Sequence, residues 1–332
     1  MKKIKALSML LALSLFLPLI SCSNPSNQAS SNSGTTPTTP LKSIALVIDS
    51  PVADGGFNAN AWKGLELAKE KYGCKIAVSE NVKQSDFESA FRDYANNGYT
   101  LILGNGSQYS DAAAAVAPDF PDVKFAVING THTAENLASL NFDNYTVCYM
   151  SGALAAYMTK TNAVGFIGGM DIFPVQDGRA GFQAGVASVN PNVKVYTAMA
   201  DSFSDMAKGK ELANSMITTN NVDILYSIGS AVDSGVMDGC KENGKYFIAQ
   251  PSDRLDEAPG TVICSAILST PDLIMILADQ VATNTFKGEK FYGTIANGVH
   301  KMGRFGKEVP QDIQDKILQL QDDIKTGKLK IK

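Results

Sequence analysis

The stretch SIALVIDSPVADGGFNANAWKGLELAKEKY, residues 43–72, decides the fold. Its first part, residues 43–49, is a continuous apolar run that ends at an aspartate, which is typical of a strand buried on both faces of a parallel sheet. Its second part, residues 58–71, has the apolar spacing of a helix. The loop between them, together with the residue on either side of it (residues 49–58), holds two aspartates, two glycines, an asparagine and a large aromatic residue.

The same unit of strand, loop and helix recurs along the chain. Further strands are expected at 75–78, 100–104, 125–128, 163–167, 194–198, 224–228, 246–249 and 262–265, and helices at 85–96, 109–120, 147–160, 175–189, 206–218 and 231–243. This alternation predicts an α/β fold with doubly wound parallel sheets. The series restarts near Ala163, so two lobes are expected, with a ligand cleft between the loops at the carboxyl ends of their strands.

The N-terminus has the pattern of an export signal. Lys2, Lys3 and Lys5 precede an apolar segment, residues 6–20, that is shorter than the roughly 20 residues of a membrane helix. Small residues then lead into Cys22, and this arrangement resembles the lipobox of bacterial lipoproteins. We expect cleavage before Cys22 and lipidation of that cysteine, with an ordinary signal peptide and an incidental cysteine as the alternative.

Residues 23–40 are almost all Ser, Asn, Thr, Pro and Gly, so they are expected to form a flexible tether. The expected layout is a signal peptide at 1–21, the lipidated cysteine and tether at 22–41, and a folded body beyond. Such a protein is anchored in the cell membrane by lipid and faces the periplasm or the cell exterior. A net charge of −4 gives no basic footprint for nucleic acid.

Four cysteines remain in the body, Cys74, Cys148, Cys240 and Cys264. They are far apart and form no C-x-x-C pair, which argues against a zinc site. Export permits disulfides, but free buried thiols are the expected state.

Polar side chains follow nearly every expected strand. The candidate ligand-binding residues are Asp49, Asp54, Phe57, Asn58, Gly106, Asn129, Tyr226, Gln250, Asp253 and Arg254. Asp and Asn at such positions also serve as helix N-caps, but capping does not explain the two aromatic residues. The set is typical of a site for a small solute that is polyhydroxylated or aromatic.

Residues for catalysis are hard to assemble from this sequence. The two histidines, His132 and His300, belong to no triad or metal pattern, and the glycines at 165–169 do not form G-x-G-x-x-G. We therefore expect no enzymatic activity, no metal ion and no cofactor.

Five segments carry a resemblance to a known family. They are IDSPVADGGFNANAW (48–62), YMTKTNAVGFIGGM (157–170), GFQAGVASVNPNVKV (181–195), DSFSDMAKGKELA (201–213) and APGTVICSAI (258–267). From about residue 43 to 268 the body resembles the basic membrane lipoproteins, the purine-nucleoside-receptor type of type I periplasmic binding protein. This resemblance implies a monomeric solute-capturing subunit of an ABC importer, with permease and ATPase subunits as partners.

The resemblance also implies domain bounds and residue roles. The last strand and the helix after it return to the first lobe, so lobe 1 is expected at 42–150 plus 264–300, lobe 2 at 151–263 and a tail with an amphipathic helix at 301–332. In nucleoside-binding members the purine lies between two aromatic rings, matched here by Phe57, with Asn58 beside it, and by Tyr226. Asp49 and Asn129 match two aspartate positions of the family.

Two departures from the family concern the ribose. Pro251 stands where an aspartate grips the ribose, and Leu268 stands where a lysine does. Some relatives take riboflavin instead, and Gln250, Asp253 and Arg254 are candidates for holding its ribityl chain. The losses favour riboflavin over a purine nucleoside, and both stay open. A surface lipoprotein that acts as an adhesin or sensor is the alternative of another class.

Overall fold

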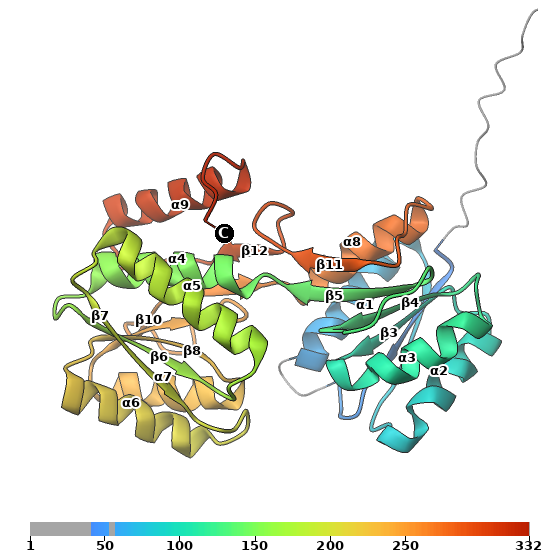
Figure 1. Cartoon of the computed structure of the whole chain (residues 1–332), viewed down its shortest axis with the longest axis horizontal. Coiled ribbons are helices and arrows are strands. Elements are labelled where there is room, and N and C mark those ends of the chain that lie inside the picture. Colours follow the sequence, from blue (N-terminus) through green and yellow to red (C-terminus); the bar gives the residue numbers. More distant parts are fainter. Residues whose placement is uncertain (1–40, 53–56, 332) are drawn as a thin grey trace, which may run out of the picture. The chain divides into compact units, whose positions relative to one another are not determined.

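The computed structural model describes residues 41–52 and 57–331 and forms two six-stranded sheets (Figure 1). Each sheet with the helices on its two faces is called a lobe. The export signal, Cys22, the tether and Asp54 lie outside the described residues. The expected fold class, a type I periplasmic-binding-protein fold with two α/β lobes, is confirmed by the mostly parallel sheets and by the solved structures reported below.

The first lobe is built on a sheet of order β11-β5-β4-β3-β1-β2, in which every pairing is parallel. Its strands are β1 (Ser43–Val47), β2 (Lys75–Ser79), β3 (Leu101–Asn105), β4 (Lys124–Ile128), β5 (Leu137–Phe142) and β11 (Lys290–Gly293). Its helices are α1 (Phe57–Tyr72), α2 (Phe87–Asn96), α3 (Ser110–Val116) and α8 (Thr270–Ala282), with short 3-10 turns η1 (Gln84–Asp86), η2 (Ser107–Tyr109) and η3 (Ala117–Asp119). The strand order reverses between β1 and β3, where such sheets bind ligands.

The second lobe repeats this plan with order β12-β10-β9-β8-β6-β7. Its strands are β6 (Ala163–Gly168), β7 (Lys194–Met199), β8 (Ile224–Ile228), β9 (Tyr246–Ala249), β10 (Val262–Leu268) and the antiparallel β12 (His300–Met302). Its helices are α4 (Asn144–Met158), α5 (Phe173–Val189), α6 (Met206–Asn220), α7 (Ala231–Glu242) and α9 (Gln311–Lys325). The order reverses between β6 and β8.

One expectation about the lobes is wrong. The strand expected to return to the first lobe is β10, and it pairs with β9 in the second sheet, where residues such as Ile263 and Cys264 join the core of that lobe. The helix that follows it, α8, does pack against α1 on the first sheet. The C-terminal helix is no separate tail, because Ile317 is buried against α4 in the second lobe.

Both faces of each sheet are covered by helices. In the first lobe α1 and α8 cover one face while α2 and α3 cover the other. In the second lobe α4 and α5 lie on one face, and α6 and α7 on the other (Figure 1). Strands β1 and β6 are accordingly buried at every residue, as their unbroken apolar runs require.

The chain passes between the lobes three times. Strand β5 leads into α4 through Asp143, β10 leads into α8 through Ser269, and β11 leads into β12. Asp143 and Ser269 each cap the helix that follows, and their backbone N–H groups donate to the carbonyl oxygens of Gly293 and Val299 at 3.0 and 2.9 Å. Hydrogen bonds therefore tie each of the first two passages to the third.

Glycines allow α4 and α5 to pack backbone against backbone. A Cβ on Gly181 or Gly185 of α5 would clash with the carbonyl oxygen of Tyr145 or Tyr149 of α4, and a Cβ on Gly152 would clash with the Phe182 carbonyl. The two helices make the most extensive helix pair of the described residues.

We predict that Gly185→Ala lowers the free energy of unfolding by about 1–3 kcal/mol, because a backbone atom cannot swing aside as a side chain would. Urea denaturation followed by circular dichroism measures the change. Ala187→Leu, on the exposed side of the same helix, is the control and should leave the midpoint nearly unchanged. Equal midpoints for parent and Gly185→Ala would contradict the close packing of α4 and α5.

Candidate functional site

The loop after β1 presents Asp49 at the carboxyl edge of the first sheet. The Asp49 side chain is exposed, and its carboxylate accepts from Gln108 Nε2 at 3.0 Å and from Ser50 Oγ at 3.3 Å. Gln108 belongs to the turn after β3, so one hydrogen bond joins the loops on the two sides of the switch point. Asp49 is therefore placed as expected for a ligand acceptor.

Asn58 has a different position from the one expected. It is 4% exposed, its Nδ2 donates to Ser50 Oγ at 2.8 Å and its Oδ1 accepts from Asn105 Nδ2 at 2.7 Å. Asn58 is therefore a buried residue that holds Ser50, in the loop after β1, in place. Asn105, which the sequence analysis did not select, ends β3 and is equally buried.

Three other expected residues lie on the first-lobe rim. Phe57 begins α1 and is 39% exposed, which leaves part of its ring available. Asn129 is exposed after β4, in a left-handed backbone conformation that asparagine tolerates. Gly106 is buried with φ of 139°, and a Cβ there would clash with the Gln108 side chain, so its role is to shape the turn that carries Gln108.

The expected clamp between Phe57 and Tyr226 is not formed. Tyr226 is fully buried in the core of the second lobe, where its ring stacks on Phe182 with centroids 5.5 Å apart and planes at 6°. Its hydroxyl donates to Gln250 Oε1 at 3.1 Å and lies 3.3 Å from Cys148 Sγ. A ring with no exposed surface cannot stack on a solute, so Tyr226 and the buried Gln250 act as internal supports here.

Asp253 and Arg254 are held by partners within the second lobe. Arg304 Nε donates to Asp253 Oδ2 at 2.6 Å, and although burial alone would raise the pKa of Asp253, hydrogen bonds from Arg304 and Leu255 lower it. Arg254 donates to Glu257 through Nε and Nη2 at 2.9 and 2.7 Å, and to Ser234 at 3.1 Å. Both side chains are therefore engaged in ion pairs within the second lobe.

A cavity of about 650 Å³ lies where the two lobes adjoin. The first lobe lines it with Ser107, Asn129 and Phe142, the second lobe with Ile172 and Phe173, and the passage between them with Asp143. Its volume lies within the roughly 300–1,000 Å³ of small-molecule sites, and its lining mixes aromatic rings with a few polar groups.

Phe173 is the aromatic residue that the sequence analysis missed. It begins α5, directly after the carboxyl end of β6, and at 71% exposure is the most exposed large apolar side chain in the described part. Pro174 in the first turn of the helix was the available signal, because it marks a helix start on the ligand-facing edge.

The cavity is acidic on its second-lobe side. Asp143 caps α4 by accepting from the Thr146 N–H at 3.2 Å, and Asp177 Oδ2 accepts from the Tyr145 N–H at 3.1 Å. Both carboxylates therefore sit at the N-terminus of α4, where the helix dipole favours negative charge. Lys290 lines the cavity from the first lobe.

Another acidic residue that the sequence analysis missed is Asp233. It lies in the first turn of α7 and is 2% exposed. Burial raises its pKa from 3.8 to about 6, although the nearby Ser227 side chain and the Arg254 guanidinium oppose that rise. Its Oδ1 and the Oγ of Ser227, at the end of β8, are buried without a hydrogen-bond partner among the described residues.

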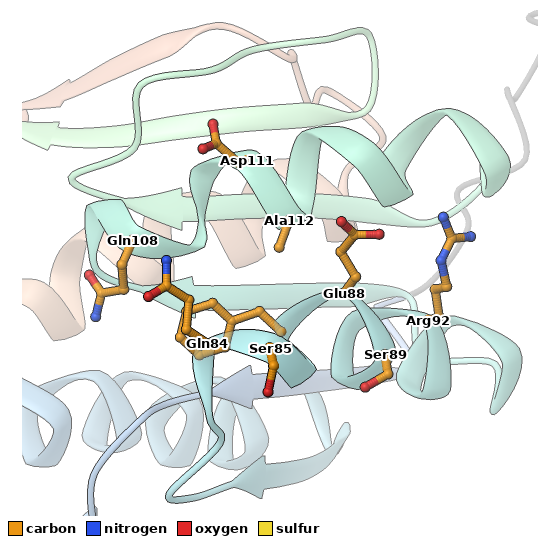
Figure 2. Close-up of a pocket in the computed structure, with 9 residues that line it drawn as sticks. Gln84, Ser85, Glu88, Ser89, Arg92, Gln108, Asp111 and Ala112 are labelled. Atoms are coloured by element: carbon orange, nitrogen blue, oxygen red, sulfur yellow. The ribbon is translucent and has the colours of Figure 1, made fainter.

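A shallower hollow of about 550 Å³ lies on the first lobe alone (Figure 2). Gln84, Ser85 and Glu88 line it from η1 and α2, and Gln108 and Asp111 line it from the facing turn and α3. Gln108 therefore borders this hollow while its amide is bonded to Asp49.

The four body cysteines are free and buried, as expected. Within residues 41–52 and 57–331, no three His, Cys, Asp or Glu side chains gather as a metal site would require. No helix in the described part is both long and apolar enough to span a membrane.

Residues 41–332 match the family model of the PnrA-like ABC transporter substrate-binding proteins, Bmp. The chain belongs to this family. Curated relatives include the transcriptional activator protein med of Bacillus subtilis, 30% identical over 87% of this chain and 90% of its own length, and basic membrane protein A of Borreliella afzelii, 29% identical over 86% and 89%. The ABC transporter nucleoside-binding protein BmpA of Lactococcus lactis is 28% identical over 92% and 93%.

Solved structures share the fold. A transcriptional activator of the comK gene from Bacillus halodurans superposes with a TM-score of 0.77 at 23% identity, covering 86% of this chain and 98% of its own. A solute-binding protein of an ABC transporter from Aeropyrum pernix gives 0.73 at 20% identity, covering 87% and 92%. Family membership makes the chain an ABC transporter substrate-binding protein, a class that captures solutes and is not enzymatic.

We predict that stability depends on the charge of Asp233. Because the native state holds the Asp233 proton more tightly than the unfolded chain, stability falls as pH rises from about 4 to about 6. The difference between 3.8 and about 6 corresponds to about 3 kcal/mol. Asp233→Asn should therefore match the parent near pH 4 and exceed its free energy of unfolding near pH 7.

Chemical denaturation at both pH values measures this difference. Asp238→Asn is the control, because Asp238 is exposed on the same helix. If the advantage of Asp233→Asn over the parent is the same at pH 4 and pH 7, the Asp233 side chain is not buried in its charged form.

Proposed function

We propose that this substrate-binding protein captures a purine nucleoside and delivers it to the membrane subunits of an ABC importer. The observation that carries the proposal is the cavity at the junction of the lobes, which combines the exposed ring of Phe173 with hydrogen-bonding groups such as Asn129 and Asp143. A flat base fits the apolar part of such a site, and a sugar fits the polar part.

The comparisons support a nucleoside over riboflavin, which the sequence analysis favoured. The lactococcal relative is described as nucleoside-binding and covers 92% of this chain. The residues named as replacements for riboflavin binding, Asp253 and Arg254, are engaged by Arg304 and Glu257. The family match likewise favours a transport receptor over an adhesin or sensor.

The ring contacts are revised within this proposal. Phe173 takes the second-lobe role first given to Tyr226, and Phe57 keeps its role in the first lobe. Asp49 accepts an N–H or O–H of the solute with the lone pairs that Gln108 and Ser50 leave free. Closure of the lobes on the solute brings the two rims together, as is usual for such receptors.

The lipid anchor at Cys22 is part of the proposal. The positive start, the apolar segment and the small residues before Cys22 support it, and a receptor without an anchor would diffuse away from its permease. The Ser- and Asn-rich segment after Cys22 gives the folded body reach above the membrane.

We predict that Phe173→Ala and Phe57→Ala each weaken the binding of inosine about ten- to a hundredfold, because each loses apolar contact and stacking. Calorimetric titration of residues 41–332 with inosine, adenosine and riboflavin measures the affinities. Tyr157→Ala, which removes a comparably exposed ring at the far end of α4, is the control and should bind as the parent does. Tight binding of riboflavin with no heat from either nucleoside would overturn the choice of solute.

We predict that Cys22→Ala abolishes lipidation and yields an uncleaved precursor or a form released from the membrane. Metabolic labelling with a palmitate analogue, together with detergent partitioning of the full-length protein, measures this. Cys74→Ala, a buried body cysteine, is the control and should keep the label. A labelled, mature-sized Cys22→Ala protein in the detergent phase would rule out the anchor.

A further inference from the structure

A chain of hydrogen bonds runs beneath the first-lobe rim. Asn105 Nδ2 donates to Asn58 Oδ1 at 2.7 Å, Asn58 Nδ2 donates to Ser50 Oγ at 2.8 Å, and Ser50 Oγ donates to Asp49 Oδ1 at 3.3 Å. Every bond in the chain therefore points the same way, from the buried end of β3 to the exposed carboxylate.

Both ends of the chain fix this direction. The Asn105 amide group faces two acceptors, because its Nδ2 also donates to the backbone carbonyl oxygen of Phe57 at 3.3 Å. If the amide were turned over, its oxygen would face both of those oxygens. At the other end the Asp49 carboxylate only accepts, so the Ser50 hydroxyl must donate to it and accept from Asn58.

Asn105 gives up a hydrogen bond to hold this arrangement. The residue is 2% exposed, and its Oδ1 has no partner among the described residues. Leaving a buried acceptor unpaired is costly. An apolar residue would fill the end of β3 without that cost, so the amide is better explained by what its donor group does to Asn58 and Phe57.

We propose that Asn105 is a positioning residue that orients the Asp49 carboxylate for the solute through Asn58 and Ser50, an inference that rests on the proposed solute-binding function. The hydrogen-bond chain delivers a donor to Asp49 Oδ1, and Gln108 delivers a donor to Asp49 Oδ2. The other lone pairs of this exposed carboxylate are left for the solute. The first lobe therefore selects solutes that present N–H or O–H groups to this rim. The same amide holds the first turn of α1, which carries Phe57.

The test is Asn105→Asp, which keeps the shape but removes the donor. At pH 8 a carboxylate at this position repels Asn58 Oδ1 and the Phe57 carbonyl oxygen. At pH 5 the carboxyl group is protonated, because burial raises the pKa of such a group, and an O–H can again donate. Parent protein at the same pH corrects for the pH dependence of solute binding and of amide exchange.

Two readouts follow the variant. Hydrogen exchange of the backbone amides in residues 57–65, measured by mass spectrometry without solute, should be about tenfold faster than in the parent at pH 8 and close to the parent at pH 5. The affinity for inosine should fall about tenfold or more at pH 8 and recover at pH 5. A residue that only fills space would also be disturbed by a buried charge at pH 8. The coupling of affinity between Asn105→Asp and Ser50→Ala, described next, is therefore the readout that distinguishes positioning from space filling.

Two further variants secure the interpretation. Asn96→Asp, on an exposed position of α2, is the charge control and should match the parent in both readouts. Ser50→Ala cuts the chain in the middle without touching the core. It should weaken inosine binding about three- to tenfold and reduce the added effect of Asn105→Asp on affinity in the double variant.

Two results would overturn the inference. One is an exchange rate of residues 57–65 in Asn105→Asp at pH 8 that equals that of the parent. The other is a loss of affinity in the double variant that equals the sum of the two single losses. If the parent protein binds none of the solutes, the proposed function fails but the exchange measurement still decides whether Asn105 holds α1. If Asn105→Asp does not fold, the affinity of Ser50→Ala decides, and an affinity equal to that of the parent overturns the inference.

Discussion

The parallel direction of the strands is the constraint on which the rest of this protein depends. Strands β1 and β6 lie inside their sheets with neighbours on both sides, so their side chains are buried and their backbone groups are paired. Parallel pairing requires every connection to cross back over a face, which brings the carboxyl ends of all these strands to one edge. The loops with Asp49, Ser107 and Asn129 meet there because they follow the carboxyl ends of β1, β3 and β4.

The passages between the lobes follow from the same constraint. Strand β10 completes the second sheet and α8 then returns to the first, while the short β12 closes the second sheet against β10. At this junction the ring of His300 stacks on Phe142 at 5.7 Å, and burial lowers the pKa of His300 to about 4. The His300 ring is therefore neutral where it packs on Phe142, and the capping residues Asp143 and Ser269 satisfy backbone N–H groups at the starts of α4 and α8.

Sequence periodicity predicted much of the fold and part of the site, for reasons visible in single residues. The nine expected strands are present, whereas β5, β11 and β12 were missed because the last two span only four and three residues and depend on their neighbours. Strand β10 was given to the wrong lobe because a strand buried on both faces has the same pattern in either sheet. Asp49 and Phe57 lie on the rim as expected, since Asp49 closely follows β1 and Phe57 begins the next helix, α1.

The burial of Tyr226 could have been predicted from the alternation of side chains along its strand. Side chains two apart along a strand lie on one face, and Ile224 and Ile228 on either side of Tyr226 both pack in the core beneath α4 and α5. The position of Tyr226 in this alternation therefore places its ring inside the lobe. Phe173 instead lies beyond the end of β6, where no neighbouring strand covers it. The alternation along a strand fixes which face of the sheet each side chain lies on, whereas residues after the strand can contact a solute. The recognition surface is therefore made of loop side chains. Buried side chains such as Asn105 and Asn58 hold those loops in place.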